Sequence, residues 1–353
     1  MGLRIIHVGV GIRGRHWLEL VKDYAETASV ACVDADNRAL DEAKSKYGST
    51  ACQYFSDLGT ALRTVEADAA LIASPSSLHT EHALKALEAG LAVMIEKPFA
   101  ADVEEASRVI RRAAEVGKPV IVAEQFRFVP AERTVRKLVQ DGLLGEITCA
   151  TFIDRRRMPS HTQGPWMATM KYPQLQEIAV HHFDSVRSFF ARQPLSVMAR
   201  VWNPPWSDYQ HGACTEAMIE MEGGLHIQYL GTLTSHRYTY SVWIEGERGV
   251  LWTNRKLVMW RARGKKLFWP VKRVSVPQGD DAPFPREGSI SLLNSLRDAL
   301  MHGKEPETSG DDNIWTLAMV EAGKRSAAEG RLVSIKEVFT HSTLPQKPQE
   351  EVA

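Results

Sequence analysis

Three ionisable residues near the middle of the sequence, Glu177, His181 and Asp184, are spaced four and three residues apart. A helix turns by about 100° per residue, so His181 lies about 40° and Asp184 about −20° from Glu177, on one narrow stripe. A histidine can accept a proton near neutral pH, and a neighbouring carboxylate can orient its ring or bind a substrate hydroxyl. The spacing therefore predicts acid–base chemistry on a helix over about 175–190, with His181 as base and Glu177 beside it.

The neighbouring histidine, His182, projects into the opposite and apolar arc of this helix. That arc contains Leu175, Phe183, Val186, Phe189 and Phe190. We therefore expect His182 to be a packed, hydrogen-bonded histidine. Because the wheel separates the two histidines by about 100°, they and Asp184 would not converge on one metal ion, and we predict no metal site.

A glycine-rich run, Gly9-Val10-Gly11-Ile12-Arg13-Gly14, directly follows an apolar strand and opens a helix. Glycines at this spacing allow a tight turn, access of a pyrophosphate to the backbone, and close packing of helix on strand. Asp34 lies 20 residues after Gly14, where a carboxylate would accept hydrogen bonds from ribose hydroxyls. It would repel a 2′-phosphate, which favours NAD over NADP unless Arg13 and Arg38 point inward.

A lysine follows another buried apolar run, in Glu96-Lys97-Pro98. The carboxyl ends of parallel strands line the ligand crevice of a doubly wound sheet, so we expect Lys97 to face the cofactor. Proline restricts the preceding residue to extended geometry, and the bond between them can be cis. An amine there would stabilise a developing oxyanion and lower the proton affinity of His181.

The elements that position these residues fall into two patterns. Up to about residue 125, apolar runs at 4–8, 30–33, 69–73, 91–95 and 120–123 alternate with helical patterns, which predicts an α/β, doubly wound parallel sheet. After Pro130 the sequence is richer in alternating and aromatic segments, which favours an α+β domain with a large open mixed or antiparallel sheet. We predict a nucleotide-binding domain over 1–125, a substrate-binding and oligomerisation domain over 126–340, and a flexible tail over 341–353.

Composition excludes several classes of protein. Among 353 residues, 43 Lys and Arg balance 43 Asp and Glu, so no net charge draws the chain to nucleic acid or an anionic membrane. No stretch approaches the about 20 apolar residues of a membrane span, and the start lacks the layout of a signal peptide. The four cysteines are widely scattered. We read them as reduced thiols in a soluble, cytoplasmic protein.

Taken in order, these motifs resemble the Gfo/Idh/MocA family, named after glucose-fructose oxidoreductase, inositol dehydrogenase and a rhizopine catabolism protein. The resemblance covers about residues 3–330 and rests on the glycine run, Ser74-Pro75 with His79, Glu96-Lys97-Pro98, Arg127, and His181-His182-Phe183-Asp184. It implies a Rossmann domain, a second domain with an open sheet, and NAD(P)-linked oxidation of sugars, inositols or related polyols. It also implies a homodimer or homotetramer.

The resemblance assigns roles to single residues. It implies that Lys97 and His181 are catalytic and that Glu177 contacts substrate, with Ser74, Pro75, His79 and Glu96 at the cofactor. Arg127 and Trp166, in the loop before the helix, are further candidates for substrate binding. The family usually has aspartate at position 177 and glycines where this chain has Tyr172, Pro173 and Ala179. The substrate pocket should therefore differ.

We therefore expect an NAD-dependent dehydrogenase that oxidises a secondary hydroxyl of a sugar, glycoside or cyclic polyol. Two alternatives stay open at this point. One is an NAD-dependent enzyme that cleaves a glycosidic bond by transient oxidation, as some relatives do. Arg13 in the glycine loop is a feature that resembles this branch of the family. The other is a non-catalytic, NAD-sensing regulatory protein on the same fold.

Overall fold

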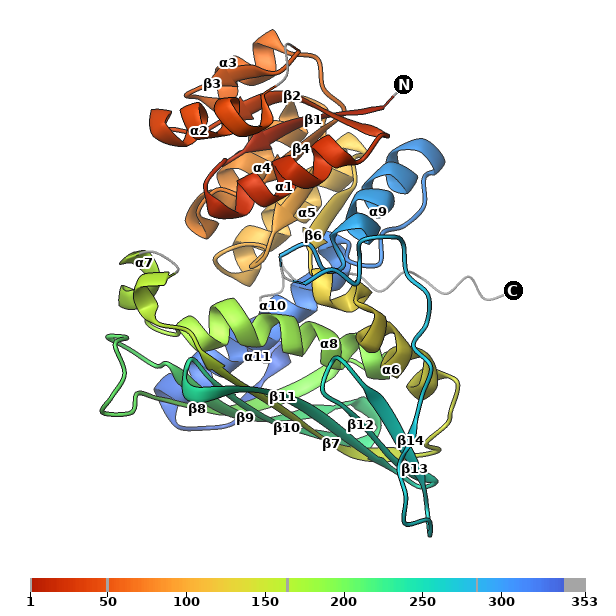
Figure 1. Cartoon of the computed structure of the whole chain (residues 1–353). Coiled ribbons are helices and arrows are strands. Elements are labelled where there is room, and N and C mark those ends of the chain that lie inside the picture. Colours follow the sequence, from red (N-terminus) through yellow and green to blue (C-terminus); the bar gives the residue numbers. More distant parts are fainter. Residues whose placement is uncertain (1, 49–50, 163–164, 284, 340–353) are drawn as a thin grey trace.

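The structure is a computed structural model that describes residues 2–48, 51–162, 165–283 and 285–339. Two sheets lie one above the other with helices between them, and the N-terminal sheet is at the top of Figure 1. The tail expected over 341–353, and residues 163 and 164 of the loop before the helix, lie outside the described residues.

The N-terminal sheet has six parallel strands in the order β3-β2-β1-β4-β5-β6, which confirms the predicted doubly wound fold. Its strands are β1 (Leu3–Val8), β2 (Thr27–Val33), β3 (Gln53–Phe55), β4 (Ala69–Ile72), β5 (Ala92–Glu96) and β6 (Val120–Ala123). Its helices are α1 (Ile12–Asp23), α2 (Asn37–Tyr47), α3 (Leu58–Thr64), η1 (Ser76–Leu78), α4 (His79–Glu88) and α5 (Val103–Val116). The sequence pattern did not predict β3 or α3.

Both faces of this sheet are covered, because β4, β5 and β6 are buried along their whole length. One face packs against α4 and α5, and the other against α1 and α9 (Ser289–His302). Helix α9 comes from late in the chain, yet Leu292, Leu293 and Leu296 are buried against Ile5 and Met94 of the N-terminal sheet. The N-terminal core is therefore completed by a helix from the predicted range of the second domain.

The second sheet has nine strands in the order β14-β13-β12-β11-β7-β10-β9-β8-β15 and is mixed, as predicted. Strands β7 and β10 run parallel, and the other neighbours are antiparallel. The strands are β7 (Ile147–Arg157), β8 (Pro194–Trp202), β9 (Cys214–Met221), β10 (Leu225–Thr232), β11 (Thr234–Gly246), β12 (Gly249–Thr253), β13 (Val258–Ala262), β14 (Trp269–Pro270) and β15 (Val333–Ser334).

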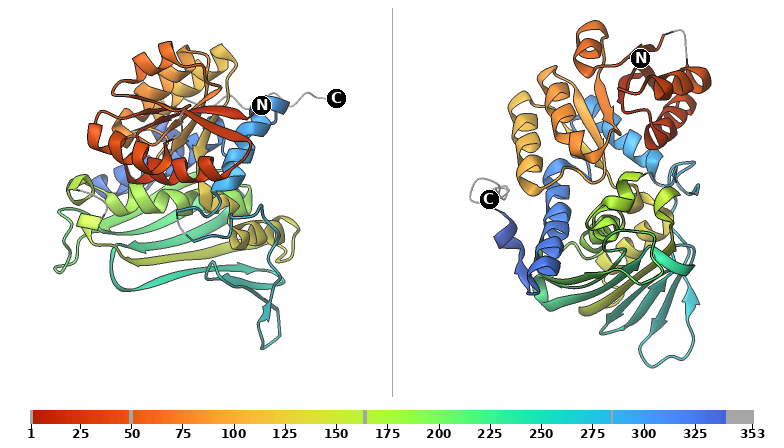
Figure 2. Two further views of the ribbon diagram at one scale, coloured as in Figure 1. Left: turned by 45° about the horizontal axis from the view of Figure 1, so that its top comes forward. Right: turned by 90° about the vertical axis from the view of Figure 1, so that its left-hand side faces the viewer.

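Helices cover the face of this sheet that is turned toward the N-terminal domain, and no helix of the described residues covers its other face, called the open face below (Figures 1 and 2). The helical segments of this half are η2 (Gln125–Phe128), α6 (Pro130–Gln140), η3 (Ser160–Thr162), α7 (Pro165–Thr169), η4 (Leu175–Ala179), α8 (Val180–Phe190), η5 (Glu222–Gly224), α10 (Gly310–Glu329) and α11 (Ile335–Val338). Helix α8 lies between the two sheets, which places the predicted catalytic stripe beside the N-terminal domain.

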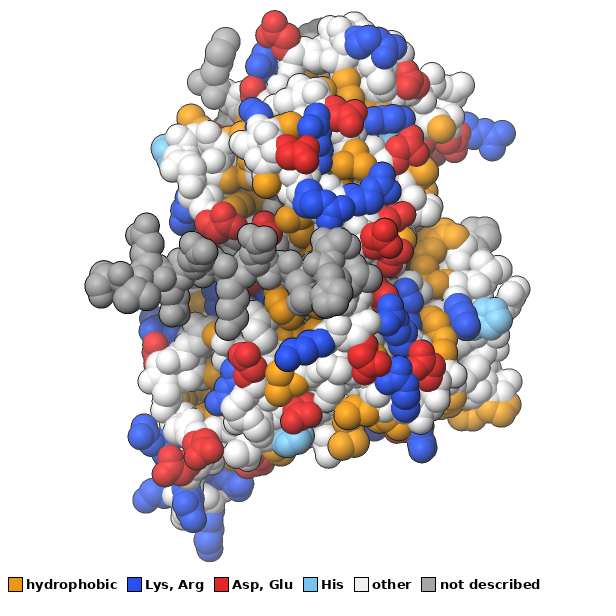
Figure 3. Space-filling model, turned by 180° about the vertical axis from the view of Figure 1, so that it is seen from behind, with side chains coloured by type: hydrophobic (Ala, Val, Ile, Leu, Met, Phe, Trp, Pro, Cys, Tyr) orange, Lys and Arg blue, Asp and Glu red, His pale blue; other side chains and the backbone are white. Residues whose placement is uncertain are grey.

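Acidic and basic side chains are interspersed over much of the face seen in Figure 3, in keeping with the balanced composition. Basic residues gather on the projecting turn between β13 and β14, where Arg263, Lys265 and Lys266 are exposed. Across the described residues, the structure contains no helix with the length and apolarity needed to cross a bilayer.

Candidate active site

Lys97 follows the carboxyl end of β5, as the strand-end argument predicts, and the bond from Lys97 to Pro98 is cis. Its Nζ donates to the Oε2 of Glu177 and to the backbone oxygen of Glu177, each at 2.9 Å. The side chains are 16% and 11% exposed, so the pair is largely removed from water. A residue from the N-terminal sheet thereby meets the first residue of the predicted stripe in the second domain.

The helix that carries the stripe is regular only from Val180 onward. Residues Leu175–Ala179, including Glu177, form a π-helical segment, η4, that continues into α8. Such widened turns occur mostly as single turns and frequently at functional sites. The uniform rotation of about 100° per residue assumed from the sequence therefore does not apply between Glu177 and His181.

His181 is buried, and its Nδ1 lies 2.5 Å from Oε2 of Glu124, the residue after β6. The ring of Phe126 packs against the imidazole in a tilted arrangement, with centroids 4.3 Å apart. Burial, followed by the positive charge of Lys97, holds the pKa of His181 well below its usual value, so the ring is neutral at neutral pH. Burial raises the pKa of Glu124 to about 7.

Glu124 was not predicted from the sequence as a partner of His181. We expected Glu177 to orient His181 or to bind a substrate hydroxyl, but the carboxylate of Glu177 pairs with Lys97, and Glu124 is the carboxylate on the imidazole. One signal was available, because Glu124 follows a parallel strand and its side chain belongs to the same edge of the sheet as Lys97.

His182 is a packed histidine, as predicted. It is buried, its Nδ1 lies 3.0 Å from the hydroxyl of Tyr229, and its Nε2 lies 3.3 Å from Asp154. Burial holds its pKa well below the usual value. Within the described part of the chain, no group of three or more His, Cys, Asp or Glu residues could hold a metal ion.

Arg127, a candidate for substrate binding, lies in the interior, where acidic residues hold its side chain. Its guanidinium forms a bidentate pair with Asp184 and lies 2.8 Å from Asp312. Arg127 and Asp184 are both buried, and a buried charge is retained only where it is paired. Asp184 therefore occupies the stripe beside His181 but serves a buried ion pair.

The glycine run forms a tight turn in which two of the three glycines leave no room for a side chain. A Cβ on Gly9, whose φ is +86°, would lie 2.5 Å from the backbone nitrogen of Ser74, and one on Gly14 would lie 2.0 Å from the oxygen of Gly9. A Cβ on Gly11 would meet nothing within 4 Å. Helix α1 begins after Gly11 without a side-chain cap, and Ile12 is 62% exposed. Uncapped amides beside open space suit a pyrophosphate.

Asp34 lies beside this loop, where its two carboxylate oxygens accept from the backbone nitrogens of Val10 and Asp36 at 2.8 and 2.9 Å. Arg13 is engaged elsewhere, since its Nε lies 2.5 Å from Glu96 and another nitrogen donates to the oxygen of Pro285. Asp34 is thus fixed beside the glycine loop, and Arg13 is held at the end of β5.

Other residues singled out from the sequence fix the edge of the sheet. The two ring nitrogens of His79 lie 2.9 Å from the backbone oxygens of Ser74 and Pro98, so one buried imidazole joins the segments after β4 and β5. The hydroxyl of Ser74 contacts His82. His79 and Ser74 thus hold the backbone near Pro75 and Lys97 in place.

Trp166 is the aromatic candidate for substrate binding, and other aromatic and arginine side chains of the second domain differ from it in their exposure and contacts. Trp166 on α7 is 51% exposed, and Trp202 and Trp206 are also exposed. Tyr209 is buried, and its hydroxyl donates to the oxygen of Met158, a packing role. Arg156 donates from Nε to Asp154 on the covered face of the second sheet.

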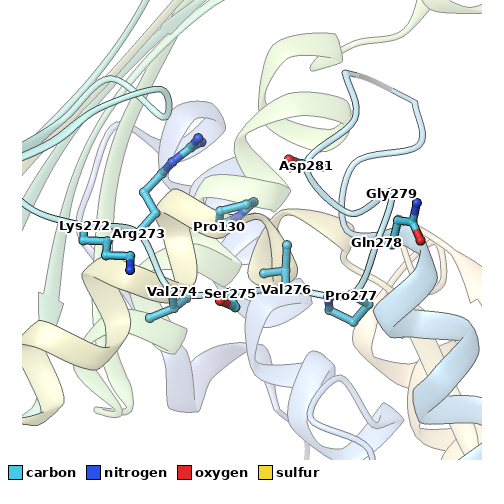
Figure 4. Close-up of a pocket in the computed structure, with 10 residues that line it drawn as sticks. All are labelled: Pro130, Lys272, Arg273, Val274, Ser275, Val276, Pro277, Gln278, Gly279 and Asp281. Carbon is cyan, nitrogen blue, oxygen red and sulfur yellow. The ribbon is translucent and has the colours of Figure 1, made fainter.

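A cavity of about 500 Å³ lies under the segment 272–279, bounded by Pro130 and Asp281 (Figure 4). Lys97, Glu177 and His181 are not among its lining residues. The candidate active site therefore lies where the segments after β5 and β6 contact the η4–α8 helix, and it is separate from this cavity.

A six-stranded nucleotide-binding sheet joined to an open mixed sheet, with a lysine and a histidine between them, defines a two-domain NAD-binding oxidoreductase. Residues 3–124 match the family described as an oxidoreductase family with an NAD-binding Rossmann fold, and residues 133–252 match the GFO/IDH/MocA C-terminal domain. The chain therefore belongs to the GFO/IDH/MocA family of oxidoreductases.

Similar proteins include D-apiose dehydrogenase of Paraburkholderia graminis, 26% identical over 93% of this chain and 88% of that enzyme. Inositol 2-dehydrogenase of Rhizobium meliloti is 24% identical over 95% of this chain and 100% of that enzyme. An oxidoreductase from Agrobacterium radiobacter, solved with NAD+, L-tartaric acid and magnesium, superposes with a TM-score of 0.87 at 19% identity, covering 96% of this chain and 100% of that one. That structural likeness shows the shared fold.

Proposed function

We propose that this protein oxidises a secondary hydroxyl of a sugar, glycoside or cyclic polyol with NAD, using His181 as the general base and Lys97 as its electrostatic partner. The observation that carries the proposal is the double hydrogen bond from Lys97 to Glu177, which brings the lysine of one domain to the helix that holds His181 in the other. Curated relatives that act on apiose and inositol support this substrate class.

The residues divide the work of the reaction. Bound NAD supplies the acceptor for the hydride that leaves the carbinol carbon. The hydroxyl proton passes to His181, which is neutral at working pH because burial and Lys97 lower its pKa. The ammonium of Lys97 stabilises negative charge that develops on the substrate oxygen. Glu177 positions this ammonium and can bind a neighbouring hydroxyl.

The cofactor side of the proposal rests on the uncapped start of α1 and on Asp34. The carboxylate would accept from the ribose hydroxyls and disfavour a 2′-phosphate, which supports NAD over NADP. Arg13, which could have reversed this preference, is paired with Glu96. Calorimetric titration with both cofactors tests the preference, and tighter binding of NADP would contradict it.

The test of function is nicotinamide reduction, followed by absorbance, across a panel of pyranosides and inositols. We expect at least one polyol to reduce NAD stoichiometrically, and His181→Ala to abolish turnover while the variant still binds NAD. Cleavage of a glycoside without accumulation of NADH would instead favour redox-assisted bond cleavage. Binding of NAD without oxidation of any polyol would favour the regulatory alternative.

We also propose that the chain forms a homodimer or homotetramer through the open face of the second sheet. Met218 on β9 is 61% exposed and Trp243 on β11 is 37% exposed on this face, and an open sheet face that carries exposed apolar side chains is suited to pairing with a second copy of the chain. Light scattering should show an oligomer, and a Trp243→Glu variant should dissociate it. The four cysteines are free, which supports a reducing, cytoplasmic location.

A further inference from the structure

We infer that Glu124 is a positioning residue for His181: its carboxylate accepts the Nδ1 proton of the imidazole and so keeps the lone pair on Nε2, the nitrogen left for substrate. This inference rests on the proposed function, since it specifies how His181 becomes a base. Glu124 itself contacts no reacting atom in this scheme.

The contact joins two domains. Glu124 directly follows β6 of the N-terminal sheet, and His181 lies on α8 above the second sheet. Oε2 and Nδ1 are 2.5 Å apart and both side chains are buried, so water does not compete for the bond. Backbone hydrogen bonds from Glu124 to Val122 at 2.8 Å and from Arg127 to Glu124 at 3.2 Å fix the segment that carries the carboxylate.

A second contact from the same segment holds the face of the ring. Phe126 lies two residues after Glu124 and packs on His181 at an interplanar angle of 31°. The guanidinium of Arg255 lies 3.9 Å from the ring centroid of Phe126 and 3.9 Å from that of Tyr240. These two cation–π contacts hold the phenyl ring of Phe126 in position. With one edge on Glu124 and one face on Phe126, the imidazole has a defined orientation.

This orientation decides the tautomer. A neutral imidazole carries one proton, and the nitrogen that donates to a carboxylate is the one that keeps it. Among the described residues, none hydrogen-bonds to Nε2 of His181, and this atom is not among the fully buried ones without a partner. Nε2 is thus both unprotonated and open, as a general base requires. When it takes the hydroxyl proton, the imidazolium forms beside the negative charge of Glu124.

Several charged groups surround the pair and set its titration. The charges of Lys97 and Arg127 lower the pKa of Glu124 and that of Glu96 raises it, but burial is the larger effect and leaves the pKa raised. The imidazole is influenced by Lys97, Arg156 and Arg255, which lower its pKa, and by Glu96, which raises it. Below about pH 7 the Glu124 carboxyl gains a proton, can donate to Nδ1, and so moves the imidazole proton to Nε2.

The test reads the tautomer directly in the full chain labelled with ¹⁵N-histidine. Two-bond ¹H–¹⁵N spectra at pH 8 distinguish a protonated Nδ1 from a protonated Nε2, and the His181→Gln spectrum identifies the signal. We expect wild-type His181 to carry its proton on Nδ1, and Glu124→Leu to shift the population toward Nε2. A wild-type proton on Nε2, or an unchanged tautomer in the leucine variant, would overturn the inference.

Kinetics with whichever polyol proves the best substrate give a second readout. Glu124→Leu should lower kcat by about 10²- to 10⁴-fold with little change in KM, as loss of a base-orienting carboxylate does. Glu124→Gln, which keeps the shape should the leucine variant not fold, should move the acid limb of kcat/KM away from pH 7. Retention of wild-type kcat and acid limb in both would count against the inference.

Asp280→Asn is the matched control, because Asp280 is another buried carboxylate and caps α9 through Ile290 and Ser291. It should leave the tautomer and the pH profile unchanged. The outcomes separate the two proposals. A correct tautomer without oxidation of any polyol rejects the proposed function alone, whereas oxidation that is indifferent to Glu124 rejects this inference alone.

Discussion

Lys97 and Glu177 are joined twice, once through the carboxylate and once through the backbone oxygen of Glu177, both at 2.9 Å. If only the carboxylate held the lysine, the ammonium would move whenever the Glu177 side chain changed rotamer. The contact with the backbone oxygen fixes the ammonium to the π-helical turn itself. The position of the cation is therefore set by the main chain of η4 and by the short segment after β5.

Replacement of this cation should remove catalysis while preserving the fold. Lys97→Met keeps most of the length of the side chain and removes its charge. We expect kcat to fall by about 10²- to 10³-fold, as for the loss of one electrostatic donor. Binding of NAD should change little, which calorimetry can check. Lys85→Met, at an exposed position of α4, is the control and should keep full turnover.

The buried ion pair between Arg127 and Asp184 should contribute to stability. Arg127→Met leaves Asp184 buried without its bidentate partner, and removal of one member of a buried pair costs about 3–5 kcal/mol of unfolding free energy. Urea denaturation followed by tryptophan fluorescence measures this loss. Lys137→Met, which breaks an exposed pair with Asp141, should change the unfolding free energy much less.

Local sequence rules were enough to predict where the glycine loop and the residues at the carboxyl edge of the N-terminal sheet lie. The glycine run, Asp34 and Lys97 could be placed from the sequence because each follows a buried apolar strand, and topology brings the carboxyl ends of such strands together. Strand β3 was not predicted because it has only three residues, Gln53–Phe55, and none of them is buried. So short a segment carries no periodic signal.

Pairings between distant segments could not be derived from the sequence. The helical wheel assumed a regular helix, whereas the π turn at Leu175–Ala179 interrupts the spacing between Glu177 and His181. Which side chains meet depends on how the two domains pack. Periodicity along the sequence therefore could not predict that Glu124, and not Glu177, contacts His181. The same holds for Arg127, whose partners lie on α8 and α10.

Acid should destabilise the protein through its buried histidines. Burial lowers the pKa of His7 to about 3, so below about pH 6.5 only the unfolded chain binds this proton, and stability falls by about 1.4 kcal/mol per pH unit for each such group. His79, His181 and His182 are shifted in the same direction. Glu124, whose pKa is raised, acts oppositely: its stabilising contribution is full below about pH 4.5 and disappears as the pH rises through about 7.

His7→Leu should therefore flatten the dependence of the unfolding free energy on pH between 5 and 6.5. Urea titrations at several pH values measure the slope, which should decrease by about 1 kcal/mol per pH unit relative to the wild type, since the unfolded His7 is only half protonated at pH 6.5. Above pH 7 the two curves should run parallel, because His7 is then neutral in both states. Equal slopes at acid pH would show that His7 titrates normally in the folded protein.

Two glycines of the nucleotide loop should respond differently to the same substitution. Gly9 has a φ of +86°, and a Cβ there would lie 2.5 Å from the backbone nitrogen of Ser74, so Gly9→Ala should destabilise the fold and weaken NAD binding together. Gly11 has a φ of −65° and open space around its Cβ position. Gly11→Ala should therefore fold with nearly wild-type stability.

The open space at Gly11 is where the pyrophosphate should approach the start of α1, so the added methyl group should weaken NAD binding by about 10-fold or more through loss of close backbone contact. Thermal unfolding and calorimetric titration of the two variants separate the effects on stability and on binding. Unimpaired NAD binding by Gly11→Ala would mean that the pyrophosphate lies elsewhere than against this turn.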